Sequence, residues 1–315
     1  MRVGRAVPRR APLGLPPALS RRRRPRPRPR QYFPNTAWPS GPQIAGECDN
    51  DPLFVALYDE LTLRHLQSVQ RPTVRDRLES WAGYVRLFDL LLAEAEDGGD
   101  GAVRLYLVPD WCFDILHEFL YQFQGFCQLR TTTYQAAAKA AGAEGGPGPG
   151  TADTLDALAR DRDAWAVGTV AGYLRRLVAA GTPAAASPTY RFLGCFAAVT
   201  LSRLECLLGD YRASVAALEP LYDPSAGTVA VGEDMRSLEE LVHGVFPARL
   251  SLAYHAGVSY LMLRRYKDAA SVLGGICLFM HRGFKVSVAR DGAAAGVRRC
   301  VRLLFLARRR SDMAR

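Results

Sequence analysis

The chain has 315 residues, of which 49% are apolar and 23% charged, enough to bury the core of one long or two ordinary domains. No uncharged apolar run reaches the roughly 18 residues that a spanning helix needs, so the composition argues against a membrane protein. The net charge of +10 is unevenly spread: residues 1–46 contain 11 arginines and no acid, residues 281–315 are also basic, and the body between them is acidic.

Residues 1–46 are predicted to form a disordered basic tail. They contain 10 of the 20 prolines and the run Arg21, Arg22, Arg23 and Arg24, so helix formation is blocked and like charges repel. One interpretation is contact with RNA or the ribosome, in which these arginines neutralise phosphates. The alternative, which we favour, is a leader or a gene-model extension without a specific role.

Residues 47–135 are predicted to form an N-terminal helical region. Asp51 followed by Pro52 is a typical helix start. Apolar residues then recur every three or four positions in two further helices: Leu78, Trp81, Val85, Phe88 and Leu92, then Cys112, Leu116, Phe119, Phe123 and Phe126. The aromatic residues around Tyr121 also resemble a base-stacking platform, but their helical spacing favours core packing.

Residues 136–150 are predicted to be a flexible linker because they are rich in glycine, alanine and proline. The glycines at 145–150 are not followed by the Gly-Lys-Ser/Thr of a phosphate-binding loop. The next region, 151–282, begins with a helix that ends near Gly181 and continues after a second linker at 184–188.

The sequence repeats itself in the last third of the chain. Residues 206–213 align with residues 261–268 at an offset of 55, which pairs Tyr211 with Tyr266 and Leu218 with Leu273. Each unit is predicted to be two helices, 190–208 with 211–221 and 249–263 with 266–280, and residues 223–247 are inserted between the units. This pattern is typical of tetratricopeptide-like repeats.

Two expectations follow from the repeat. Each tyrosine ring, at 211 and 266, should fill the wedge between its own two helices, while Arg212 and Lys267 point to solvent. The last helix should need a neighbour, because it carries apolar residues such as Leu273, Ile276, Leu278 and Phe279 around much of its circumference. No alternating strand pattern persists, so the predicted fold class is all-α: a helical-repeat, tetratricopeptide-like solenoid with a disordered basic N-terminal tail.

No catalytic, cofactor-binding or metal-binding residue is predicted. His117-Glu118 lacks the second histidine of an H-E-x-x-H zinc site, and Ser259 lacks the glycines of a nucleophile elbow. The seven cysteines contain no CxxC pair and several lie among apolar residues, as reduced core thiols do. The pattern indicates a non-enzymatic, cytoplasmic protein.

Four blocks of sequence resemble one known family. They are Asp51-Pro52-Leu53-Phe54, Tyr121-Gln122-Phe123-Gln124, Leu207-Leu208-Gly209-Asp210-Tyr211, and Arg264-Arg265-Tyr266 after Tyr260-Leu261-Met262. In this order they resemble the subunit L family of eukaryotic translation initiation factor 3, over about residues 51–282. The resemblance implies a helical-repeat scaffold that continues into a PCI domain, a helical array capped by a winged helix.

The resemblance also implies a function through protein contacts. The expected partners are other subunits of the initiation factor and the small ribosomal subunit, to which the complex recruits mRNA and initiator tRNA; a membrane is not expected. Two alternatives stay open: a PCI-type subunit of another assembly, such as the proteasome lid or the signalosome, and an RNA-binding protein that acts through its Arg-rich termini.

Residues 283–315 are interpreted as a basic tail outside the family, so that the C-terminal PCI and winged-helix module is expected to be missing. The segment 296–310 has the character of a short basic amphipathic helix for an acidic partner or a membrane surface. A truncated gene model or read-through into non-coding sequence is the interpretation we favour.

Overall fold

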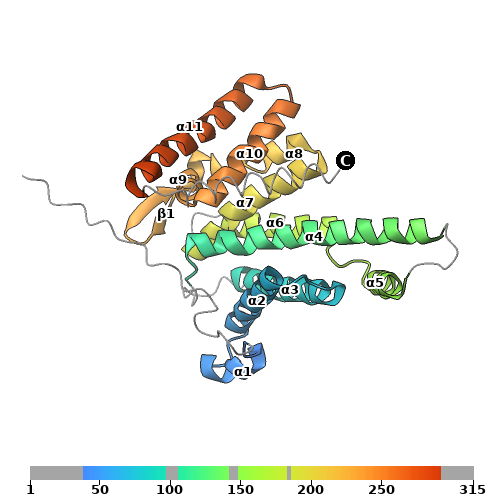
Figure 1. Cartoon of the computed structure of the whole chain (residues 1–315). Coiled ribbons are helices and arrows are strands. Elements are labelled where there is room, and N and C mark those ends of the chain that lie inside the picture. The colour runs from blue at the N-terminus through green and yellow to red at the C-terminus, as the bar shows by residue number, and fades with distance from the viewer. Residues whose placement is uncertain (1–37, 97–105, 142–147, 183–185, 292–315) are drawn as a thin grey trace, which may run out of the picture. The chain divides into compact units, whose positions relative to one another are not determined.

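The computed structural model describes residues 38–96, 106–141, 148–182 and 186–291. Contacts divide the chain into two units, Met1–Pro39 and Ser40–Arg315. The α-helices of the second unit are shown in Figure 1: α1 (Gly41–Ala45), α2 (Pro52–Val69), α3 (Val74–Glu96), α4 (Pro109–Ala141), α5 (Pro149–Arg160), α6 (Val167–Gly181), α7 (Pro188–Leu208), α8 (Tyr211–Ala216), α9 (Leu238–Gly244), α10 (Phe246–Met262) and α11 (Tyr266–Asp291). The helical fold class is confirmed. Residues 1–37 of the predicted disordered tail lie outside the described residues, and its end is corrected, because residues 41–45 form α1.

One small β-hairpin adds to the predicted all-α fold. Strands β1 (Thr228–Val231) and β2 (Asp234–Ser237) pair antiparallel, with Thr228 opposite Ser237. Gly232 at the turn has φ +67°, a conformation that glycine adopts without strain. The hairpin lies within the insertion between the two repeats, where four-residue strands are too short for an alternating pattern to be recognised.

The predicted helix starts and apolar stripes are confirmed. The Asp51 carboxylate accepts a hydrogen bond from the Leu53 N–H at 2.9 Å and so caps α2. Residues of the predicted stripes form the core between α3, α4 and α6, and the fully or largely buried members are Phe88, Leu92, Cys112, Leu116, Phe119, Phe123 and Phe126. Core packing is therefore the role of Phe123 and Phe126.

Trp165 connects the parts of this core. It lies just before α6 in a left-handed conformation (φ +54°), and its Nε1–H donates to the Arg77 carbonyl of α3 at 3.0 Å. Its ring is 5.0 Å from that of Trp81 and 5.4 Å from that of Phe119, centroid to centroid. This aromatic cluster holds α3, α4 and the start of α6 together.

The predicted linker boundary at residue 136 is corrected by the structure. Helix α4 continues through Ala141, because its last residues include three successive alanines, the strongest helix formers, and a lysine in the final turn. Helix α5 then begins at Pro149, inside the predicted linker. Residues 142–147 lie outside the described part of the chain.

Helix α7 lies at the centre of the unit and packs against α4, α6, α8 and α10 (Figure 1). It approaches α6 closely because glycines face each other: a Cβ built on Gly194 would lie 2.7 Å from the Gly181 Cα. The buried Arg191 side chain donates to the carbonyls of Gly181 at 3.1 Å and Thr182 at 2.8 Å, which caps the end of α6. Among the described residues no helix is long and apolar enough to cross a membrane.

Candidate interaction surface

The two predicted repeats share the same turn. After α7, the N–H of Asp210 donates to the Glu205 carbonyl at 3.0 Å, and Gly209 has φ +86°. After α10, the N–H of Arg265 donates to the Tyr260 carbonyl at 2.8 Å, and Arg264 has φ +61°. Both are Schellman motifs, in register at the offset of 55 residues.

A seam of buried hydroxyl groups places the two turns at the same end of the repeats. Ser259, near the end of α10, donates to the Ser214 Oγ of α8 at 2.9 Å, and Ser214 donates to the Ser202 carbonyl of α7 at 2.9 Å. Ser259 also hydrogen-bonds with the Cys206 thiol, whose pKa is raised by burial. The ends of α7 and α10 are therefore adjacent.

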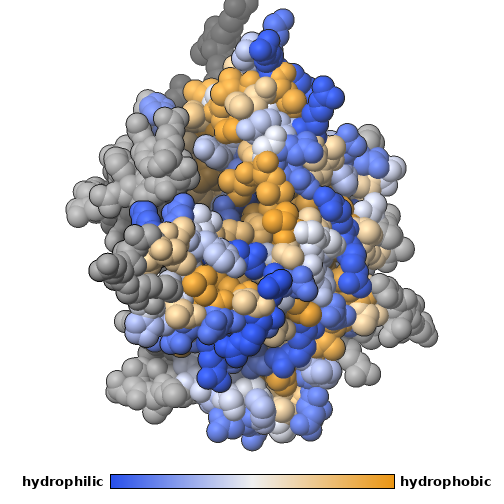
Figure 2. Space-filling view, turned by 90° about the vertical axis from the view of Figure 1, so that its right-hand side faces the viewer, coloured by the Kyte–Doolittle hydropathy of each residue, from blue (hydrophilic) through white to orange (hydrophobic). Residues whose placement is uncertain are grey.

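Large apolar side chains emerge at these adjacent ends. Five of them have exposed fractions of 48–60%, and we call them the repeat-end surface: Leu207, Leu208, Leu261, Met262 and Tyr266. Figure 2 views the molecule from the side to which these ends point in Figure 1, and apolar surface alternates there with hydrophilic surface. A cluster of this kind is typical of a protein-binding site.

The four predicted repeat positions differ in burial. Leu218 is buried, and the Leu273 side chain packs on α10, where a Cβ built on Gly257 would lie 2.5 Å from it. Tyr211 is half-buried. Tyr266 is 60% exposed, so the expectation that its ring fills a wedge is wrong. The reason is position: α10 packs against α8 beside Tyr211, whereas no described helix lies on the outer side of α11.

Of the cations singled out from the sequence, two lie in the described part of the chain and four lie outside it. Arg212 and Lys267 are exposed, as expected from their places beside the repeat tyrosines. The arginines at 21–24, predicted as an RNA contact, lie outside the described residues.

Helix α11 carries further apolar residues, some of them exposed. Ile276 is buried against the unit, while Leu278 and Phe279 are exposed. The Phe279 ring lies 6.1 Å from that of Phe246, and the Arg249 guanidinium is 3.8 Å from the centre of the Phe279 ring. The Arg249 cation therefore covers part of the Phe279 ring.

His117 lies in a partly buried polar cluster of α4, α7 and α10. Its Nδ1 accepts from the Arg203 Nη1 at 3.2 Å, and His255 Nδ1 donates to the Ser251 carbonyl at 2.7 Å. Burial, reinforced by the Arg203 charge, lowers the pKa of both histidines to about 4. Within the described ranges no group of three His, Cys, Asp or Glu side chains is placed to hold a metal ion.

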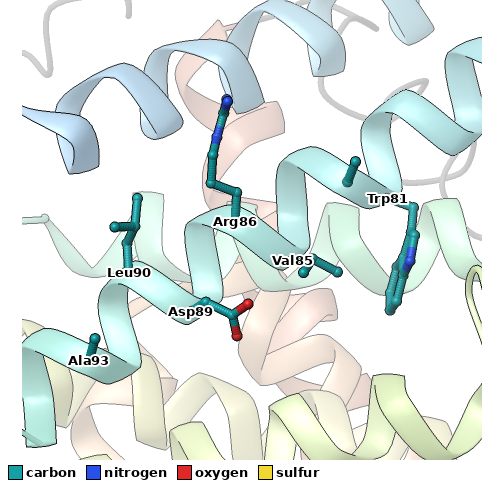
Figure 3. A pocket seen from close by; sticks show the side chains of 7 residues that line it. Trp81, Val85, Arg86, Asp89, Leu90 and Ala93 are labelled. Carbon is teal, nitrogen blue, oxygen red and sulfur yellow. The ribbon is translucent and has the colours of Figure 1, made fainter.

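A shallow depression lies along α3. Its floor is formed by Trp81, Val85, Leu90 and Ala93, and Arg86 and Asp89 point to opposite sides of the helix (Figure 3). Arg86 pairs with Asp59 of α2, and Asp89 accepts from the Tyr173 hydroxyl of α6 at 2.9 Å. Because one helix supplies the whole lining, the depression is an open groove rather than an enclosed ligand site.

The sequence does not predict that the side chains of the repeat-end surface are exposed. Leu207, Leu208, Leu261 and Met262 read as the last turns of apolar helices, which is compatible with burial. The available signal was the doublet of large apolar residues directly before each turn, where a helix end lies at the surface.

The chain is similar to known proteins over most of its length. The family described as RNA polymerase I-associated factor PAF67 matches residues 76–304. Over 273 residues, 80% of this chain, the sequence is 31% identical to eukaryotic translation initiation factor 3 subunit L of Gallus gallus and of Homo sapiens. The subunit of Nematostella vectensis is 29% identical over 272 residues.

These matches also define boundaries. The chain covers 43% of the chicken and human relatives and 46% of the Nematostella relative, so it spans less than half of their length. The family match continues to residue 304, which corrects the expected end of the resemblance at residue 282. Residues 283–304 therefore belong to the matched part of the chain, not to a tail outside the family.

Proposed function

This chain belongs to the family of RNA polymerase I-associated factor PAF67, and from that premise we propose that it is a non-catalytic scaffold subunit of eukaryotic translation initiation factor 3. The assembly is inferred from the relatives, which are named as subunit L of that factor. In this proposal the chain works in the cytoplasm, where it binds other subunits and supports mRNA and initiator tRNA recruitment to the small ribosomal subunit.

The repeat-end surface is the observation that carries the scaffold role. Five large apolar side chains at half exposure cost free energy in water, and burying them against a partner recovers roughly 25 cal/mol per Å² of apolar surface. They stand on helices whose relative position is fixed by the buried serine seam, so the surface is organised before a partner arrives.

Affinity capture tests the proposal. The tagged full chain is expressed in eukaryotic cells, and the captured proteins are quantified by mass spectrometry. We expect to capture subunits of initiation factor 3 and proteins of the small ribosomal subunit. The captured amount of these proteins should fall about fivefold or more for the variant Leu208→Ser/Met262→Ser. Met235→Ser removes an exposed methionine of the hairpin and is the matched control.

Other outcomes identify the alternatives. Capture of proteasome-lid or signalosome subunits in place of initiation-factor subunits would move the chain to another assembly. Capture that requires RNA and falls steeply between low and high salt would indicate a direct RNA-binding protein, because counterion release dominates such contacts. Circular dichroism of each variant checks that lost capture does not reflect unfolding.

A further inference from the structure

The charges around the repeat-end surface are unbalanced. The two turn segments, 207–212 and 261–268, contain four cations and two carboxylates. Both carboxylates are already engaged: Asp210 accepts from the Ala213 N–H at 2.9 Å, and Asp268 pairs with Arg265 at 2.7 Å.

The remaining cations have no such partner. In the part of the chain that the structure describes, Arg212, Arg264 and Lys267 are exposed and make no ion pair. Arg212 and Lys267 occupy matched positions of the two repeats, each directly after a repeat tyrosine. The surface therefore presents the same combination twice: an apolar helix end with a free cation beside it.

We propose that the repeat-end surface binds a protein segment that is both apolar and acidic, such as an amphipathic helix whose carboxylates face the free cations. The proposal deepens the function proposed above by specifying the chemistry of the partner. Apolar side chains of the segment would cover Leu207, Leu208 and Met262, and its acids would pair with Arg212 and Lys267 at the rim. Complementary charge at a rim mainly sets the choice of partner and the association rate.

The apolar residues favour a protein over RNA as the occupant. Four of the five side chains of the surface are aliphatic or thioether groups, which bury well against other apolar side chains. A base-stacking platform requires aromatic or guanidinium planes, and Tyr266 is the single aromatic member of this surface.

Site-specific photocrosslinking tests the proposal. The full chain carries p-benzoyl-phenylalanine at position 262 in eukaryotic cells, and crosslinked segments are identified by mass spectrometry. We expect protein segments in which Asp and Glu outnumber Lys and Arg and apolar residues recur every three or four positions. The same crosslinker at position 235 gives the background level.

A charge reversal provides the second measurement. Arg212→Glu/Lys267→Glu should lower the yield of the position-262 crosslink about tenfold. Lys139→Glu/Arg160→Glu reverses two exposed charges on α4 and α5, away from the repeats, and should leave the yield unchanged. Equal thermal unfolding of both double variants shows that the fold is retained.

Several results would overturn the inference. Crosslinks to RNA, to neutral or basic segments, or at no more than the position-235 level each contradict it, as does an undiminished yield after charge reversal. Crosslinks to an acidic segment of a protein outside initiation factor 3 would support this inference and reject the proposed function. If initiation-factor subunits are captured but the segments crosslinked at position 262 are basic, the proposed function is supported and this inference is rejected.

Discussion

The two repeats, α7–α8 and α10–α11, have the same turn between their helices but differ in which helices cover them. Both turns close with the same pair of backbone hydrogen bonds and a residue in the left-handed region. Helix α7 is buried by α4, α6 and α10, whereas among the described elements α11 packs mainly on α10. The same local sequence therefore produces the same turn, and the place in the array decides which side chains become core.

The difference between Tyr211 and Tyr266 illustrates this. A solenoid repeat cannot bury its own faces, so each helix depends on the next for cover. In the first repeat α10 supplies that cover, and in the second the aromatic ring stays in solvent. Exposed apolar side chains at the second repeat follow from this arrangement and form part of the proposed binding surface.

The largest expected effect concerns the glycines that let helices approach. In the first repeat, a Cβ at Gly194 would lie 2.7 Å from the Gly181 Cα and 3.1 Å from the Leu177 carbonyl oxygen, which are backbone atoms of α6. Gly194→Ala should lower the free energy of unfolding by about 3 kcal/mol. Gly257→Ala meets only the Leu273 side chain, which can rotate, so a loss of about 1 kcal/mol is expected. Urea denaturation compares the two, and equal losses would contradict the distinction.

The second effect is acid sensitivity around α7. The pKa of His117 and of His255 is lowered from 6.5 to about 4 in the folded protein, so the unfolded chain binds more protons between those values. The free energy of unfolding should therefore fall as the pH decreases from about 6.5 to 4, by on the order of 2 kcal/mol for each of the two histidines.

Variants assign this pH dependence to the cluster. His117→Gln keeps an acceptor for Arg203 and removes one titrating group, so the slope of stability against pH should decrease. His243 is exposed on α9, and His243→Gln should leave the slope as it is. A slope that is the same in both variants would mean that the acid sensitivity arises elsewhere.

The repeat tyrosines should differ by a smaller amount. Tyr211→Ala is expected to cost about 1–2 kcal/mol of unfolding free energy because the tyrosine is only partly covered. Tyr266→Ala should cost less than about 1 kcal/mol, since its ring is largely in water. Thermal unfolding of the full chain measures both losses of stability. A larger loss for Tyr266→Ala than for Tyr211→Ala would indicate that the Tyr266 ring is buried between its two helices, as the repeat pattern predicts.

The smallest effect tests the shared turn. Arg264 adopts a left-handed conformation that glycine adopts at the matched position 209, so Arg264→Gly should raise the free energy of unfolding by about 0.5–1 kcal/mol. Gly209→Ala should lower it by about 1 kcal/mol for the opposite reason. Denaturant titrations measure both changes in unfolding free energy. Changes of opposite sign would confirm that the two turns are equivalent, and changes of the same sign would show that they are not.

Features that depend on neighbours in the chain could be predicted from the sequence. The Asp51 cap, the apolar stripes of α3 and α4, and the 55-residue repeat all follow from side chains within a few positions of one another. The repeat also located the unit that carries the proposed binding surface, though not the residues of that surface. Local spacing shows that Leu207 and Met262 end apolar helices, but not that they stay exposed.

The remaining features depend on residues that are far apart in the sequence. The Nε1–H of Trp165 donates to the Arg77 carbonyl 88 positions away, and Ser259 reaches Ser214 across 45 positions. The sequence alone determined where most of the helices lie, the Asp51 cap and the repeated turn, because backbone hydrogen bonds and capping act within one or two helical turns. The tertiary structure decided which helix ends meet and which tyrosine is covered, because burial depends on the elements that pack beside a residue.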